Sequence, residues 1–322
     1  MIKYDMHVHT EFSSDSEEKV ENQINEAMKK GLKGICITDH IDLEFPEKEA
    51  AGCDFLFDLD SYFDTLGKIR DKYKSCMNVM IGVEFGLRNE AKVAQTCIDG
   101  YKELAKKYDF DFIIGSTHCL DFCDPYYPKY WENKSSMEGL ENYFCAVRDN
   151  VNSYDDFDAL GHLDYLVRYV QPASVQKYLS TYSKVDYVVG RDVVTPIIND
   201  EKDFRYVSYD NRKSDEVIEK FGYRPMDYAD IFDEILKKII EKGKALEINS
   251  AGLKYGIGFA HPRMEILRRY RELGGELITI GSDAHAGKEI AFGFWNVFEL
   301  LENLGYKYYF VYENRKPRGI LL

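Results

Sequence analysis

Long apolar runs are missing from this 322-residue chain. No stretch approaches the roughly 20 apolar residues that a transmembrane helix needs, so the sequence argues against a membrane protein. Residues 1–5 run directly into a predicted strand and show no signal-peptide pattern. We therefore expect a cytoplasmic protein that has no membrane partner.

Basic residues are in short supply as well. The chain carries 42 Lys and Arg against 56 Asp and Glu, which gives a formal net charge of −14. Nucleic-acid binding draws on a basic surface, and the sequence has no stripe of Lys and Arg and no RNA-binding signature. These absences argue against nucleic acid as a partner. Oligomeric state is left open by the sequence.

Cysteine pairs at metal-binding spacing are also absent. The seven cysteines are scattered over the first half of the chain, and no CxxC pair is present. An odd number of scattered cysteines is typical of free thiols rather than of a disulfide framework. Only Cys119 and Cys123, just after His118, leave a thiolate site open. The chain has no Gly-rich dinucleotide fingerprint either.

What the sequence does contain is a regular alternation of strands and helices. The predicted strands are short, mostly apolar runs at residues 4–9, 34–38, 79–84, 112–116, 157–161, 245–249, 277–281 and 308–312. Such alternation predicts right-handed β-α units and a parallel sheet. Seven or eight units favour a closed or nearly closed barrel, and an open doubly wound sheet is the alternative.

One stretch breaks this rhythm. Residues 164–222 carry several arginines and many tyrosines but no clear strand-helix unit. The stretch is too long for a simple connection. We interpret the chain as one domain, residues 1–322, with an insertion around residues 164–222 that covers the barrel mouth.

Histidines and acids gather at the predicted strand ends. Glu84 and Asp283 stand at such positions, and so do six of the seven histidines, namely His7, His9, His40, His118, His162 and His285. Residues two apart in a strand face the same side, so His7 and His9 can reach one ion. A barrel places the C-terminal ends of its strands on one face. Because histidine with carboxylate suits zinc, manganese and iron, we predict a multinuclear metal site there.

Four motifs make this pattern specific. They are His7-Val8-His9, Thr38-Asp39-His40, Glu84 with His118, and Asp283-Ala284-His285, and His162 is a further ligand position. In this order, over nearly the whole chain, they resemble the PHP (polymerase and histidinol phosphatase) family. Within the family the chain is most similar to the monofunctional histidinol-phosphate phosphatases, by its length and by residues 12–16, 161–164 and 247–250.

The resemblance implies a distorted TIM-like (β/α)7 barrel that holds up to three divalent ions (zinc, manganese or iron) at the C-terminal ends of its strands. Carried over by position, the ligands of the first ion would be His7, His9, Glu84 and Asp283. The second ion would share Glu84 and add His118 and His162. The third would take Asp15, His40 and His285. Many family members have a histidine where Asp15 stands.

The implied activity is hydrolysis of a small-molecule phosphate ester, L-histidinol phosphate, in histidine biosynthesis. Three divalent ions bring about +6, and the carboxylates of Asp15, Glu84 and Asp283 remove three charges, so a phosphate dianion and a hydroxide would neutralise the site. We expect a metal-bridging hydroxide to attack phosphorus, while Asp283 or His285 passes a proton to the leaving oxygen.

Other residues are candidates for substrate contacts. Arg168 and Arg191 can hold phosphate oxygens in pairs, and Asn249 and His261 stand at or just after the sixth strand. We expect Asp39 and Asp164 to orient ligand imidazoles or to cap helices. Two alternatives stay open. The same site could serve another ester, such as a nucleotide, a sugar phosphate, a phosphotyrosine protein or a nucleic-acid end, or the chain could be a non-catalytic metal-binding module.

Overall fold

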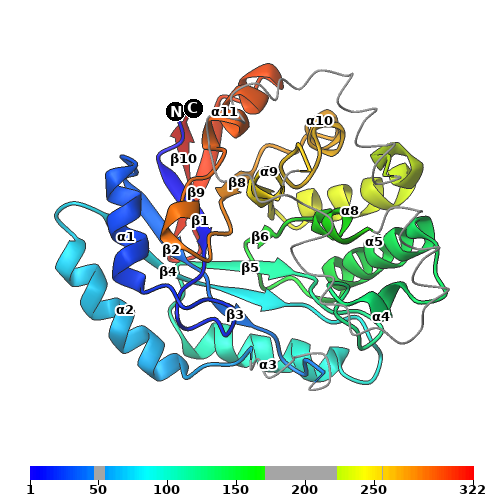
Figure 1. The fold of residues 1–322 in the computed structure, drawn as a ribbon, viewed down its shortest axis with the longest axis horizontal. Helices are drawn as coiled ribbons and strands as arrows, with labels where there is room; N and C mark the ends of the chain where they lie inside the picture. The colour runs from blue at the N-terminus through cyan, green and yellow to red at the C-terminus, as the bar shows by residue number, and fades with distance from the viewer. Residues whose placement is uncertain (47–54, 171–222, 256) are drawn as a thin grey trace.

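A curved sheet of parallel strands forms the centre of the molecule (Figure 1). The computed structural model describes residues 1–46, 55–170, 223–255 and 257–322. Its strands lie in the order β1 (Tyr4–Val8), β2 (Gly34–Ile37), β4 (Asn78–Gly86), β5 (Phe112–Ser116), β6 (Ala159–Leu160), β7 (Ala245–Asn249) and β8 (Ile278–Gly281). Every pairing in this order is parallel, and the short β3 (His40–Ile41) pairs with β4.

The two ends of the sheet meet at a seam between β1 and β8. A parallel bridge joins Val8 to Ala284, and the amide of His9 donates to the Ala284 carbonyl at 2.9 Å. The amide of Asp283 donates to the His7 carbonyl, also at 2.9 Å. The sheet is therefore a nearly closed barrel of seven parallel strands, as the sequence predicts, and the open doubly wound alternative is wrong.

Helices surround the barrel (Figure 1). They are α1 (Val20–Lys29), α2 (Leu59–Tyr73), α3 (Ala94–Lys107), α4 (Pro128–Trp131), α5 (Ser136–Ser153), α8 (Ala229–Glu241), α9 (Ala251–Lys254), α10 (Met264–Glu272) and α11 (Phe294–Asn303), with 3-10 turns at Tyr165–Tyr169, Pro225–Tyr228 and Gly287–Glu289. The longer helices bury one apolar stripe each; in α8 it includes Phe232, Leu236 and Ile239. The helices pack against the sides of the barrel, so the C-terminal ends of the strands can carry polar side chains.

Two details of the predicted strands are wrong. Glu84 does not end its strand, because β4 continues to Gly86 and Glu84 lies inside it. The last predicted strand is not in the barrel, because β9 (Tyr308–Glu313) pairs antiparallel with β10 (Lys316–Leu321). The two residues between them, Asn314 and Arg315, have φ values of 50° and 62°, as a tight hairpin turn requires. Neither is glycine, so the sequence carries little hairpin signal.

Most of the predicted insertion lies outside the described residues. Its first residues form the 3-10 turn Tyr165–Tyr169, and residues 171–222, with Arg191, are not described. That the insertion covers the barrel mouth stays a prediction. In the described part of the chain, no helix combines the length and the apolar character needed to cross a membrane.

Candidate metal centre

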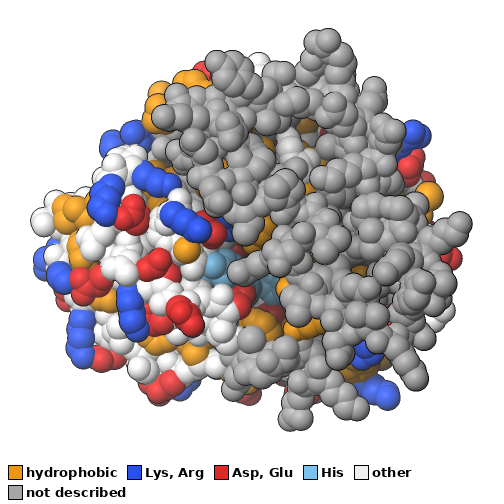
Figure 2. Space-filling view, viewed as in Figure 1, with side chains coloured by type: hydrophobic (Ala, Val, Ile, Leu, Met, Phe, Trp, Pro, Cys, Tyr) orange, Lys and Arg blue, Asp and Glu red, His pale blue; other side chains and the backbone are white. Residues whose placement is uncertain are grey.

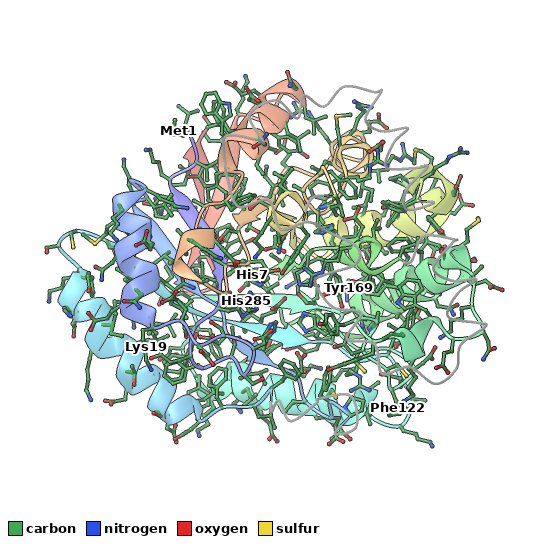
Figure 3. The ribbon with its side chains drawn as sticks, in the orientation of Figure 1. Met1, His7, Lys19, Phe122, Tyr169 and His285 are labelled. Carbon is green, nitrogen blue, oxygen red and sulfur yellow. The ribbon has the colours of Figure 1, made fainter. Side chains whose placement is uncertain are left out.

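The predicted ligand side chains meet at one end of the barrel, and two of them, His7 and His285, lie close together near the centre of the view in Figure 3. The six imidazoles form a continuous cluster whose neighbouring ring centroids lie 4.2 to 5.9 Å apart. His7, His9 and Glu84 are fully buried, and histidine atoms are visible on this face of the molecule (Figure 2). The convergence that a metal site requires is therefore present.

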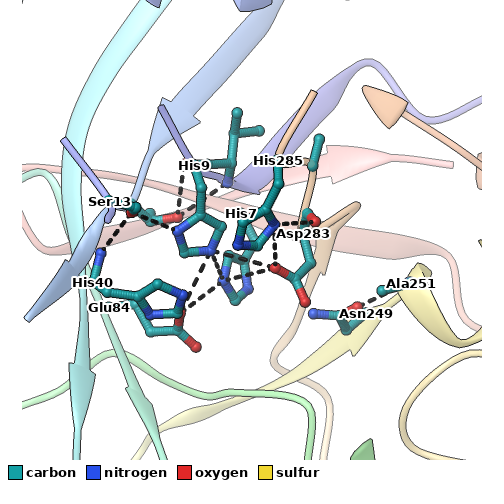
Figure 4. Close-up of polar contacts among 12 residues, drawn as sticks. His7, His9, Ser13, His40, Glu84, Asn249, Ala251, Asp283 and His285 are labelled. Carbon is teal, nitrogen blue, oxygen red and sulfur yellow. Dashed lines mark hydrogen bonds and ion pairs between the residues drawn. The ribbon is translucent and has the colours of Figure 1, made fainter. Parts of the chain in front are cut away.

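The predicted ligands of the first ion are His7, His9, Glu84 and Asp283 (Figure 4). The Nε2 atoms of His7 and His9 lie 3.0 Å apart. Glu84 Oε2 lies 3.2 Å from His7 Nε2, and Asp283 Oδ1 lies 3.3 Å from His9 Nε2. A tetrahedral ion with bonds of about 2.1 Å has ligand atoms about 3.4 Å apart. His7, His9 and Asp283 are spaced to surround one ion, and Glu84 Oε2 lies within 3.5 Å of both imidazoles.

Glu84 also faces a second group with its other oxygen. Its Oε1 lies 2.8 Å from His162 Nε2 and 3.2 Å from His118 Nε2. The carboxylate, which lies inside β4 and below the rim, therefore stands between two sets of imidazoles. This position suits a ligand that two ions share.

The third predicted group lies nearest to solvent. Asp15 Oδ2 lies 3.2 Å from His285 Nε2 and 3.6 Å from His40 Nε2. The Asp15 side chain is 38% exposed, whereas that of His40 is 11% exposed. The structure thus brings all nine predicted ligands together, with Asp15 at the rim.

Hydrogen bonds behind the rings fix which nitrogen faces the cluster. His7 Nδ1 lies 2.6 Å from Glu247 Oε1, and His118 Nδ1 lies 2.9 Å from Asp42 Oδ2. A carboxylate accepts hydrogen bonds and does not donate them, so each Nδ1 carries the proton. The Nε2 atoms of His7 and His118 therefore direct lone pairs at the cluster, as metal ligation requires.

One buried oxygen fits a bound cation. Glu84 Oε2 has no hydrogen-bond partner among the described residues, although nitrogens of His7 and His40 lie within 3.2 Å of it. A buried acceptor without a donor is costly, and a divalent ion removes that cost. The donor set of imidazole and carboxylate fits zinc, manganese or iron.

Two glycines make room for the partners of the rings. A Cβ at Gly281 would lie 2.3 Å from the Cβ of His7 and 2.6 Å from Glu247 Oε1. A Cβ at Gly86 would lie 1.9 Å from Asp42 Oδ1. Any larger residue would displace a carboxylate that orients a ligand, so the site requires glycine at both positions.

Charges within the cluster are coupled. Burial opposes the charged form of Glu84, and only positive charge beside it, such as protonated His7 and His118, holds the pKa of its carboxyl well below the usual range. Burial holds the pKa of His9 well below its usual value, and the neighbouring His40 lowers it further. The buried carboxylate thus requires positive charge beside it, which a divalent ion would supply, whereas the crowded His9 resists protonation.

The backbone at Asp283 adopts an uncommon conformation. Its φ is 53°, in the left-handed region, although the residue is not glycine. The carbonyl of Asp283 accepts hydrogen bonds from Lys254 Nζ at 3.1 Å and from His285 Nδ1 at 3.0 Å. These contacts hold a strained turn that aims the Asp283 carboxylate at the cluster.

The four predicted substrate residues have different surroundings. The Arg168 guanidinium lies over the rings of Tyr255, Tyr169 and Tyr165, at 4.4, 4.7 and 5.1 Å from their centroids. Arg191 lies outside the described residues.

The other two are fully buried. The amide nitrogen of Asn249 lies 3.4 Å from Glu247 Oε2, and its oxygen accepts from the amide of Ala251. His261 Nδ1 donates to Asp164 Oδ1 at 2.7 Å. Asp164 therefore orients His261 rather than a ligand imidazole. Contacts of Asn249 and His261 with substrate stay predictions.

The thiolate alternative finds no support in the described residues. Burial raises the pKa of Cys119 well above its usual value, so this thiol keeps its proton. Among the described residues, the groups spaced for a metal contain only histidine and carboxylate, and neither Cys119 nor Cys123 belongs to one.

Comparison with known proteins identifies the family. The model of the PHP domain matches residues 5–190, more than half of the chain. The chain belongs to the PHP domain family. A probable histidinol-phosphatase of Clostridium acetobutylicum is 31% identical to this PHP chain over 304 residues, which are 94% of each protein. A histidinol-phosphatase of Lactococcus lactis is 28% identical over 296 residues, 89% of this chain and 86% of that protein.

Solved structures share the PHP barrel. The histidinol phosphate phosphatase of Lactococcus lactis, in complex with zinc, L-histidinol and phosphate, has a TM-score of 0.74 at 24% identity and covers 98% of both chains. The putative histidinol phosphatase of Listeria monocytogenes has a TM-score of 0.63 at 21% identity and covers 91% of this chain and 99% of that chain. These likenesses support the fold over nearly its whole length.

Sequence reasoning assigns no role to Glu247 and Asp42, which orient His7 and His118 in this PHP protein. A usable signal exists for Glu247, because an acid in the fully buried strand β7 is costly unless it is paired. Asp42 stands two residues after His40, and only the fold shows that it contacts His118 instead.

Proposed function

We propose that this PHP protein is a metal-dependent phosphomonoesterase that hydrolyses L-histidinol phosphate to L-histidinol and phosphate in histidine biosynthesis. The observation that carries the proposal is the cluster of nine predicted ligand side chains, among them the buried carboxylate of Glu84. The names of all five curated relatives, histidinol-phosphatase or probable histidinol-phosphatase, support this substrate.

The groups described above would hold three divalent ions, which we take to be zinc, manganese or iron. The first ion would have His7, His9, Glu84 and Asp283, the second Glu84, His118 and His162, and the third Asp15, His40 and His285. When bound, such ions offset the charge of phosphate oxygens and lower the pKa of bound water. Nine ligands for three ions leave positions open for an ester.

Two residues compete for the role of proton carrier. His285 donates its Nδ1 hydrogen to the carbonyl of Asp283 at 3.0 Å, so its Nε2 lone pair points at Asp15. That arrangement suits a ligand better than an acid. The Asp283 carboxylate is 11% exposed at the side chain and can take a proton from attacking water and return it to the leaving oxygen. We therefore assign proton transfer to Asp283.

A panel of phosphate monoesters tests the substrate. With zinc or manganese present, we expect kcat/KM for L-histidinol phosphate to exceed that for a nucleotide, a sugar phosphate and a phosphotyrosine peptide by about 100-fold or more, because binding the amine and imidazole adds contacts. Phosphate release is the measurement. Comparable rates on all esters would still support a phosphoesterase activity but would contradict L-histidinol phosphate as the specific substrate.

Arg168 offers a test of phosphate recognition. Its Nε is buried and has no hydrogen-bond partner among the described residues, and three tyrosine rings hold the guanidinium in place. We expect Arg168→Met to raise KM by about 10-fold to 100-fold with a smaller change in kcat, because a planar donor for phosphate oxygens is lost.

The matched control for this variant is Arg148→Met. Arg148 pairs with Asp149 on α5, outside the cluster, and its loss should leave both constants unchanged. An unchanged KM in Arg168→Met would mean that Arg168 only stacks on its tyrosines.

A further inference from the structure

A serine hydroxyl lies between a predicted ligand and a buried acid in the loop after β1. Ser13 Oγ is 3.1 Å from His9 Nδ1 and 2.7 Å from Asp39 Oδ1 (Figure 4). It also accepts a hydrogen bond from the amide of His40 at 3.1 Å. Ser13 and Asp39 are almost completely buried. The hydroxyl therefore has three partners and no access to bulk water.

The single hydrogen of this hydroxyl must go to Asp39. Asp39 already accepts from the amide and the hydroxyl of Thr10, at 2.6 and 2.8 Å. It also accepts from the amide of Ser13 at 3.2 Å. Both amides donate to the same oxygen, Oδ1, which therefore carries no hydrogen of its own, so its contact with Ser13 Oγ must use the serine hydrogen.

The hydrogen on His9 follows from this assignment. Ser13 Oγ gives its hydrogen to Asp39 and uses one lone pair for the amide of His40. The remaining lone pair can only accept, so His9 Nδ1 must carry a hydrogen and donate it to Ser13. His9 Nε2 is then left as the lone-pair nitrogen.

This tautomer matters because His9 belongs to two ligand groups. It is grouped with His7 and Asp283, and also with His40 and His285, whose rings stack on it at centroid distances of 4.2 Å. Its free atom, Nε2, lies 3.0 Å from His7 Nε2 and 3.3 Å from Asp283 Oδ1. Only one nitrogen of His9 is available, and it points at the first group.

We propose that Ser13, held by Asp39, is a positioning residue that keeps the His9 proton on Nδ1 and thereby commits His9 Nε2 to the ion shared with His7 and Asp283. The inference deepens the proposed function and rests on its metal site. The partner of His9 is a neutral hydroxyl, whereas His7 and His118 have carboxylates. The hydroxyl orients the His9 ring without placing a further charge beside the stacked imidazoles of His40, His9 and His285.

Ser13→Ala tests the proposal through zinc binding rather than turnover. We expect the variant to bind its most tightly held zinc ion about 10-fold to 100-fold more weakly in competition with a chromophoric chelator, because the loss of a ligand's orienting partner has effects of this size. Ser13→Thr, which keeps the hydroxyl, should retain affinity close to wild type. Ser14→Ala, a neighbouring exposed serine, should not differ from wild type.

The tautomer can be read directly in the unaltered protein. Long-range ¹H–¹⁵N correlation spectra of the zinc-loaded chain should show His9 protonated on Nδ1. Protonation on Nε2 would overturn the proposal even if Ser13→Ala fails to fold. Wild-type zinc affinity in a folded Ser13→Ala variant would overturn it as well, and so would an equal loss in Ser14→Ala. A wrong substrate assignment would instead appear in the ester panel and leave these readouts unchanged.

Discussion

Replacing Glu84 with glutamine is expected to lower kcat/KM for L-histidinol phosphate by about 1000-fold or more. The two oxygens of this carboxylate face different groups, one with His7 and the other with His118 and His162. An amide removes the negative charge that both groups share and directs an N–H at imidazole lone pairs. Phosphate release and metal content per chain are the measurements, and both should fall.

The control for this prediction is Glu299→Gln. Glu299 is an exposed residue of α11, and its substitution should change neither measurement. If Glu84→Gln kept wild-type turnover, the cluster would not be catalytic, and the non-catalytic metal-binding module would become the better account of this chain.

Removing the ions is the second change with a large expected effect. Treatment with a strong chelator should abolish phosphate release, and addition of zinc or manganese should restore it, whereas calcium, which prefers oxygen ligands, should not. The Tm should fall by roughly 5 to 10 °C, because an ion present at 1000 times its Kd stabilises the folded state by about 4 kcal/mol. Calorimetry with and without added ion measures this shift.

Metal content and activity can be measured on the same sample. Full activity in protein that contains no transition metal by elemental analysis would exclude the proposed role of the cluster. A Tm that is unchanged while activity disappears would mean that the ions contribute to catalysis but little to folding.

The barrel could be predicted from sequence because its strands are short buried runs separated by amphipathic helices. The predicted runs at residues 112–116 and 245–249 agree with β5 and β7 at both ends. The convergence of the nine predicted ligand side chains could be predicted for the same reason, since parallel strands bring their C-terminal ends to one face. At these strands the apolar pattern of the sequence and the topology of the barrel indicate the same structure.

The partners of the ligands were not accessible in the same way. Glu247 meets His7 because β8 runs beside both β7 and β1, and Gly281 leaves room for the contact. Asp42 directly follows β3, and it contacts His118, which lies just after β5. Such pairings depend on the register between strands far apart in the chain, which hydrophobic periodicity does not encode.

The seam between β1 and β8 has a consequence for biosynthesis. The predicted ligands His7 and His9 leave the ribosome long before Asp283, which emerges only after β8, the last strand of the barrel, has been made. A nascent or truncated polypeptide can therefore offer only part of the first coordination set. Under the proposed ligand assignment, stable acquisition of that ion would be a late event that follows the synthesis of β8.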